Sequence, residues 1–373
     1  MNTSAQKALL DALTQHQAYL YRASSQSVNE LIKRFNSLSN TQLQRLSELL
    51  EELTDSERNA LKSFNFGSKA KTSKLIEEIK TILDEWFTSI DVDLSEKFHK
   101  SALDLAIYEA AYTAKLAGDA AVVVASAEIY KTARKTPFAG GQLVDYLFAD
   151  IADSLRKKVE YVIRDGISQG QTNQQIVQRI KGKKSLDYKD GLFKSSRESI
   201  ERQVRTVRSH VANAAYEETY KALGFTHLKF IATLDGRTSK QCASLDANVY
   251  DINKAYPKPP LHYNCRSVLI GVDADGKLSG KRPFVSDSRP VRDIPKTERE
   301  GKIGQVSANT TFKSWFAQQD EEFKREWLGK SKYKLYAEGG YSLDRFVDPI
   351  GREYTLKELK LMDKKTFKNL GLL

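Results

Sequence analysis

The stretch Thr233-Leu-Asp-Gly-Arg-Thr-Ser-Lys-Gln-Cys242, joined by a proline-rich loop to Pro259-Pro-Leu-His-Tyr-Asn-Cys-Arg-Ser267, concentrates the unusual residues of this chain. Both cysteines of the protein, Cys242 and Cys265, lie inside it. The apolar patterns of residues 227–233, 248–252 and 266–272 predict three short strands around it. We therefore expect a small β-hairpin or sheet module over residues 227–272.

The chain before this module is predicted to be helical. Between residues 3 and 134, apolar residues recur at spacings of three and four, which predicts short amphipathic helices with polar joints and Ser27 as one cap. A break at Pro137, Gly140 and Gly141 precedes two longer helical patterns, at about residues 143–162 and 197–223. The predicted fold class is α+β, a predominantly helical body followed by a small sheet.

The composition changes after residue 272. Residues 273–307 are rich in Gly, Pro, Ser and alternating charges, which predicts an extended linker. Aromatic residues return after it, and they predict a small C-terminal module. The expected division is a helical N-terminal region at 1–136, a domain of helices and a small sheet at 137–272, a linker at 273–307 and a module at 308–373.

Composition and charge restrict the class of protein. The most apolar stretch, residues 103–127, contains Asp104, Glu109, Lys115 and Asp119, so we expect a buried helix pair and no membrane segment. Two cysteines and no cationic, apolar leader indicate a reducing compartment. The net charge of +11 favours a polyanionic partner, most simply nucleic acid. The basic clusters expected to contact it contain Lys181, Lys183, Lys184, Lys281 and Arg282.

Cys242, His262 and Cys265 are spaced like part of a zinc site. A structural zinc needs four ligands, and the fourth would be Asp235, Asp246 or water. The favoured interpretation has no cofactor: two buried thiols and a hydrogen-bonded histidine pack the hairpin, with zinc as the alternative. A disulfide and a catalytic Cys–His pair rank below both.

Asp235 and Arg237 flank Gly236 directly after a predicted strand. Their side chains could pair, or cap the short helix expected around residues 239–245. An Asx-type turn with an exposed Arg237 is the favoured interpretation.

The two quoted segments resemble the signature of the phage Mu F-like minor head proteins, also called the SPP1-type head morphogenesis family. That family's pattern is similar to Asp-x-Arg-Thr-Cys-x-x-Cys-x-x-Leu followed by Pro-Pro-x-His-x-x-Cys-Arg-Cys. Ser239 and Ser267 stand here where the family has cysteines, and the resemblance extends over about residues 143–271. The positions that match are Asp235, Arg237, Thr238, Cys242, Leu245, His262, Cys265 and Arg266.

The resemblance implies a minor head protein, not an enzyme. It would lie inside the virion at the portal, after assembly in the host cytoplasm, and would assist head assembly and DNA packaging or ejection. The implied partners are the portal protein, the major capsid or scaffolding protein, and packaged double-stranded DNA bound without sequence preference.

The competing class is a metal-assisted nuclease or toxin-like enzyme acting on nucleic acid. It lacks support because the remaining histidines, at positions 16, 99, 210 and 227, stand in no group with ligand spacing. A sequence-specific DNA binder would need a recognisable reading element, and the sequence contains no helix-turn-helix or zinc-finger spacing.

Overall fold

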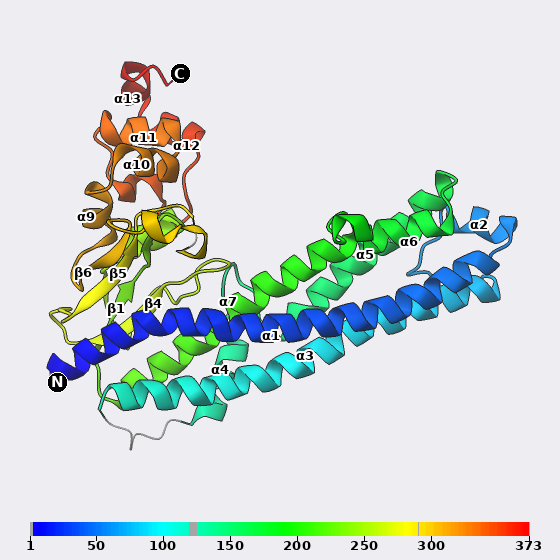
Figure 1. Cartoon of the computed structure of the whole chain (residues 1–373), viewed down its shortest axis with the longest axis horizontal. Coiled ribbons are helices and arrows are strands. Elements are labelled where there is room, and N and C mark those ends of the chain that lie inside the picture. Colours follow the sequence, from blue (N-terminus) through cyan, green and yellow to red (C-terminus); the bar gives the residue numbers. More distant parts are fainter. Residues whose placement is uncertain (1–2, 119–124, 290, 373) are drawn as a thin grey trace. The chain divides into compact units, whose positions relative to one another are not determined.

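The computed structural model describes residues 3–118, 125–289 and 291–372. This part of the chain is mostly helical with two small sheets of three strands each, so the predicted α+β class is confirmed (Figure 1). No helix in it combines the length and apolar character needed to span a bilayer. The helices of the N-terminal half are α1 (Thr3–Glu52), α2 (Asp55–Leu61), α3 (Lys74–Leu116), α4 (Ser126–Lys135), α5 (Leu147–Ser168), α6 (Asn173–Lys181) and α7 (Leu192–Ala222).

The chain forms two compact units. One comprises residues 1–20, 106–129 and 209–373, and the other comprises residues 21–105 and 130–208. Helices α1, α3, α4 and α7 each contribute residues to both. Because each unit combines segments that are far apart in the sequence, local composition could not define them. The predicted division into four segments stays a prediction, apart from its linker, which is corrected below.

In the second unit, which comprises residues 21–105 and 130–208 and contains no strand among its described residues, α1 and α3 lie side by side in opposite directions. Arg34 Nε donates to Asp93 Oδ2 at 2.9 Å, and Arg45 Nη1 donates to Glu85 Oε2 at 2.8 Å. A later residue of α1 therefore pairs with an earlier residue of α3, so the two helices are antiparallel. Apolar residues of both helices are buried, and they include Leu31, Phe35, Leu46, Leu50, Ile79, Leu83, Trp86 and Ile90.

The prediction of short helices with polar joints is wrong for this region. Helix α1 runs for 50 residues without interruption, and Ser27, the predicted cap, lies in its interior. A polar residue inside the helix, Ser39, is accommodated there because it is buried and accepts a hydrogen bond from Trp86 Nε1 at 3.1 Å. Part of the predicted helix pair at residues 103–127 lies outside the described residues, while residues 103–116 form the end of α3.

The first sheet confirms the three predicted strands. β1 (His227–Ile231) lies between β3 (Val249–Asp251) and β4 (Val268–Val272), with both neighbours antiparallel to it. β4 is buried along its whole length, which suits its continuous apolar sequence. Gly271 is needed within it because a Cβ there would lie 2.8 Å from the Phe225 ring.

The second sheet corrects the predicted linker. β5 (Lys281–Val285) pairs antiparallel with β6 (Ile303–Ser307), and both lie inside residues 273–307. On its other side, β5 pairs in parallel with the two-residue strand β2 (Leu234–Asp235). A segment with few apolar residues is ordered here because its backbone completes a sheet with a strand that precedes it by about 50 residues of chain.

The C-terminal helices share one hydrophobic core with this sheet. They are α9 (Phe312–Ala317), α10 (Glu321–Leu328), α11 (Lys330–Ala337), α12 (Leu356–Met362) and α13 (Lys364–Asn369). Their buried aromatic residues, including Trp315, Phe316 and Trp327, cluster with Leu234 of β2 and Ala243. Phe284 of β5 packs against the same cluster.

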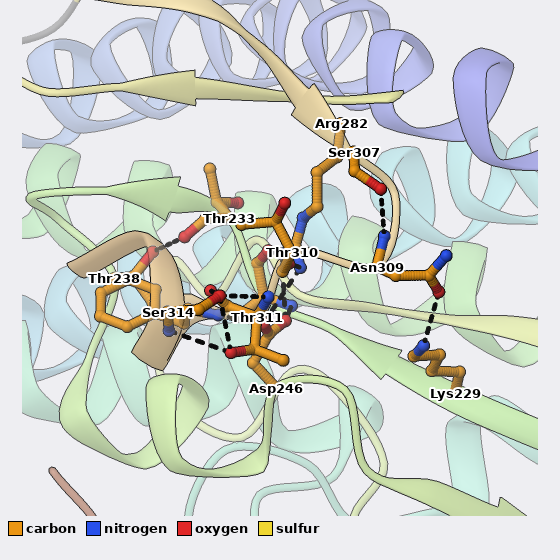
Figure 2. Close-up of polar contacts among 12 residues, drawn as sticks. Lys229, Thr233, Thr238, Asp246, Arg282, Ser307, Asn309, Thr310, Thr311 and Ser314 are labelled. Atoms are coloured by element: carbon orange, nitrogen blue, oxygen red, sulfur yellow. Dashed lines mark hydrogen bonds and ion pairs between the residues drawn. The ribbon is translucent and has the colours of Figure 1, made fainter. Parts of the chain in front are cut away.

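An ion pair between Asp246 and Arg282 lies at the centre of the sheet region (Figure 2). Arg282 is 1% exposed, and its Nη1 and Nη2 each lie 3.0 Å from one oxygen of the Asp246 carboxylate. Asp246 also accepts from the backbone N–H groups of Ala232 and Phe312, at 2.7 and 2.6 Å. Arg282 donates in turn to the carbonyls of Thr310 and Ala232. Since its guanidinium is buried and both of its terminal nitrogens are bonded within the protein, the prediction that Arg282 contacts DNA is wrong.

We expect Asp246→Ala to destabilise the protein by about 3–5 kcal/mol, because it leaves the Arg282 guanidinium buried without its carboxylate. The matched control is Asp344→Ala, which removes the partner of Lys313 from an exposed pair and should cost no more than about 1 kcal/mol. The urea midpoint followed by tryptophan fluorescence measures both variants. Equal midpoint shifts in the two variants would contradict this assignment.

Candidate functional site

The matching positions of the sequence motif come together from two segments. The first contains β2, the turn at Gly236 and helix α8 (Lys240–Leu245), and the second is the loop that leads into β4. Ser239 caps α8 by accepting a hydrogen bond from Cys242 N at 3.1 Å. Trp327 of α10 supports the turn, because its Nε1 donates to the Thr238 carbonyl at 2.9 Å.

Asp235 connects the two segments. It is 2% exposed, and both of its oxygens accept from the Arg266 guanidinium, with Nη2 at 2.8 Å from Oδ1. The same Oδ1 accepts from Arg237 N at 3.0 Å, which closes the predicted Asx turn and leaves the Arg237 side chain exposed. Burial acts to raise the pKa of Asp235, but the Arg266 guanidinium outweighs it and holds that pKa below its usual value.

The Asp235–Arg266 pair was not predicted from the sequence. The two residues are 31 positions apart, and local reasoning considered only Arg237 as a partner. The signal in the sequence that could have indicated this pair was that both residues belong to the same motif. The pair shows that this part of the motif has a structural role, because it joins the β2 turn to the loop before β4.

Cys242, His262 and Cys265 form a compact cluster next to this pair. The two cysteines are free thiols with Sγ atoms 3.6 Å apart, and they are 2% and 4% exposed. His262 Nε2 lies 3.3 Å from Cys242 Sγ and 2.8 Å from Ser239 Oγ. Its Nδ1 donates to the Tyr263 carbonyl at 2.9 Å, which fixes the ring orientation.

The cluster favours one thiolate. The hydrogen bond from Cys242, aided by His262, holds the pKa of Cys265 well below its ordinary value despite burial. The same contact with Cys265, together with burial, raises the pKa of Cys242. The contact with Cys265 also raises the pKa of His262, against the effect of burial. These pKa shifts share one direction: they favour a proton on Cys242 and on His262 over a proton on Cys265.

The donor set meets the needs of a zinc ion only in part. One ligand atom from each of Cys242, His262 and Cys265 lies within 4.8 Å of the others, and these are soft donors that zinc prefers. The carboxylates considered as a fourth ligand are engaged elsewhere, Asp235 by Arg266 and Asp246 by Arg282. The hydroxyls of Ser239 and Ser267 also lie beside the cluster, and both are weak ligands at positions where the motif has cysteine.

We expect the purified protein to retain less than stoichiometric zinc, because only three strong ligands are present and hydrogen bonds already satisfy them. Ser239→Cys should convert the cluster into a four-ligand site that retains one equivalent. Metal analysis after dialysis against a mild chelator measures both proteins. Ser244→Cys, a serine elsewhere on α8, is the matched control and should not gain zinc.

One equivalent of zinc in the unmodified protein, lost in Cys265→Ser, would contradict this expectation and show that three residues suffice.

The remaining basic positions differ in their surroundings. Lys183 and Lys184 are exposed on the loop after α6, whereas Lys181 is half-buried with its Nζ 5.5 Å from the centroid of the Tyr188 ring. Lys281 is exposed next to the buried Arg282. Lys183, Lys184 and Lys281 therefore stay the most accessible of the predicted DNA contacts.

Residues 157–270 match the model of the family described as Phage Mu protein F like protein. The matched segment begins within α5, contains all eight predicted motif positions, and lies within the range of resemblance predicted from the sequence. The predicted resemblance is thus confirmed for this segment. The other comparisons found no matching curated protein and no matching solved structure. The match supports a protein related to the phage head.

Proposed function

We propose that this chain is a minor head protein of a phage, bound to the portal inside the head, where it assists head assembly and the packaging or ejection of DNA. The observation that carries the proposal is the match of residues 157–270 to the Mu F-like family. The portal protein is the primary partner, and the major capsid or scaffolding protein is a second. Assembly would take place in the host cytoplasm, and the mature location would be the virion.

The geometry of the motif favours a binding role over catalysis. Cys265 has the lowered pKa that a nucleophilic cysteine needs, but it is 4% exposed and its Sγ lies 3.6 Å from that of Cys242, which leaves little access for a substrate. Asp235 is 2% exposed and neutralised by Arg266. Residues that hold two segments of chain together suit a protein that acts through its surfaces.

When the protein and the portal of the same phage are expressed together, we expect them to co-purify as one species larger than the portal ring. Size-exclusion chromatography of the tagged complex measures this association. The control is the portal of an unrelated phage, which should elute alone. Separate elution of the matched pair at micromolar concentrations would rule out stable portal binding.

The proposed DNA contact rests on the net charge of +11 and on the exposed lysines of the loop after α6. Lysines bind phosphates through charge and release condensed counterions, so such binding is independent of sequence and weakens steeply with salt.

We expect weak filter binding to duplex DNA that falls by at least about tenfold between 50 and 200 mM salt. Replacing both Lys183 and Lys184 by Ala should weaken it, while the matched double change at Lys364 and Lys365 should have a smaller effect, although both remove two exposed positive charges. Salt-independent binding, or equal losses in the two double variants, would exclude this loop as the contact.

A further inference from the structure

A cavity of about 420 Å³ lies between the turn after β2 and helix α10. Its volume is within the ~300–1,000 Å³ typical of ligand sites. One side contains Arg237 and Lys240, and the other contains Phe323, Glu326 and Trp327. The site is distinct from the cysteine cluster, whose Cys242, His262 and Cys265 do not line it.

The guanidinium of Arg237 lines this cavity and makes a weak ion pair within the protein. The Arg237 side chain is 45% exposed, and within the described part of the chain its acidic partner is Asp235, whose Oδ2 lies 3.5 Å away. Charge-assisted bonds between arginine and carboxylate are usually about 2.7–2.9 Å long. Since Arg266 already holds both oxygens of Asp235, the Arg237 guanidinium retains donors for a further anion.

Lys240 is the second cation of the cavity. Its side chain is 20% exposed, and its Nζ lies 4.7 Å from the centroid of the Trp327 ring. Among the described residues, the carboxylate paired with it is Glu353, whose oxygen lies 4.0 Å away, beyond hydrogen-bond length. Glu353 is held more closely by Lys332. A largely buried ammonium without a close acceptor favours an incoming anion.

The other residues of the cavity select the kind of anion. Glu326 is exposed and Glu353 also lines the cavity, so a rigid duplex, whose phosphates are fixed in a row, would meet like charges there, whereas a flexible peptide can place one carboxylate in the cavity and keep its others outside. Phe323 and Trp327 are each 7% exposed, which leaves no open aromatic face for stacking a base. A single carboxylate side chain of a polypeptide can bind the two cations, and it needs neither space for a row of phosphates nor an open aromatic face.

We propose that this cavity binds a carboxylate side chain of an acidic polypeptide segment, held between Arg237 and Lys240. The proposal concerns this surface alone and does not rest on the proposed phage function. It gives Arg237, a motif residue whose side chain contributes little to the fold, a direct contact with a partner.

The test uses the full chain and a fluorescein-labelled hexaglutamate peptide, with hexaglutamine as the uncharged control. We expect anisotropy to detect hexaglutamate only. Arg237→Ala should weaken binding by about tenfold, because one charge-assisted contact is lost. Glu326→Gln should strengthen binding severalfold, because a repulsive carboxylate is removed while the shape of the residue is retained.

Lys364→Ala removes one exposed positive charge elsewhere and should change the affinity by less than about twofold. Melting curves verify that each variant is folded, and a gain of affinity in Glu326→Gln cannot arise from misfolding. The proposal is overturned by undetectable hexaglutamate binding, by equal losses in Arg237→Ala and Lys364→Ala, or by no gain in Glu326→Gln. It is also overturned if a short DNA duplex binds more tightly than the peptide and depends on Arg237.

Discussion

The ion pair between Asp246 and Arg282 connects segments of both sheets with the start of the C-terminal helices. Asp246 follows α8 and accepts the N–H groups of Ala232, just after β1, and of Phe312, at the start of α9. Arg282 lies in β5 and donates to the carbonyls of Ala232 and Thr310. A buried guanidinium is tolerated only when its donors are matched, so the surrounding segments must adopt one arrangement. The pair thereby fixes where β5 lies and, through β5, the second sheet.

The matching motif residues serve the same local architecture through a second set of contacts. Asp235 and Arg266 join the β2 turn to the loop before β4, and the cysteines with His262 pack where that loop passes α8. Ser239 has two roles here, since its hydroxyl caps α8 and also contacts His262. The replacement of a motif cysteine by serine therefore retains a polar contact at this position. It removes the thiolate that a complete zinc site would need.

Arg237 is the exception among these residues. The backbone of Arg237 closes the turn, but its side chain remains exposed at the cavity beside Trp327. Within the protein this guanidinium makes a long ion pair with Asp235, at 3.5 Å. Because it lines the same cavity as Lys240, its position favours an interaction with a partner. The same loop can therefore combine a rigid backbone with a cationic surface, because Arg266 makes the closer contacts with the buried Asp235.

The sequence by itself determined the helical body, the three strands of the first sheet and the motif, because apolar periodicity and unusual residue spacing are local properties. It also indicated the closeness of Cys242, His262 and Cys265, because the chain between α8 and β4 returns to the helix that carries Cys242. Only the tertiary structure decided that α1 is continuous, that residues 281–285 and 303–307 pair as strands, and that Arg282 is buried while Lys281 is exposed. Each of these depends on a partner distant in sequence: Trp86 for Ser39, β2 for β5, and Asp246 for Arg282. Local composition cannot show such partners, because hydrogen bonding and burial of a polar group are set by what lies beside it in space.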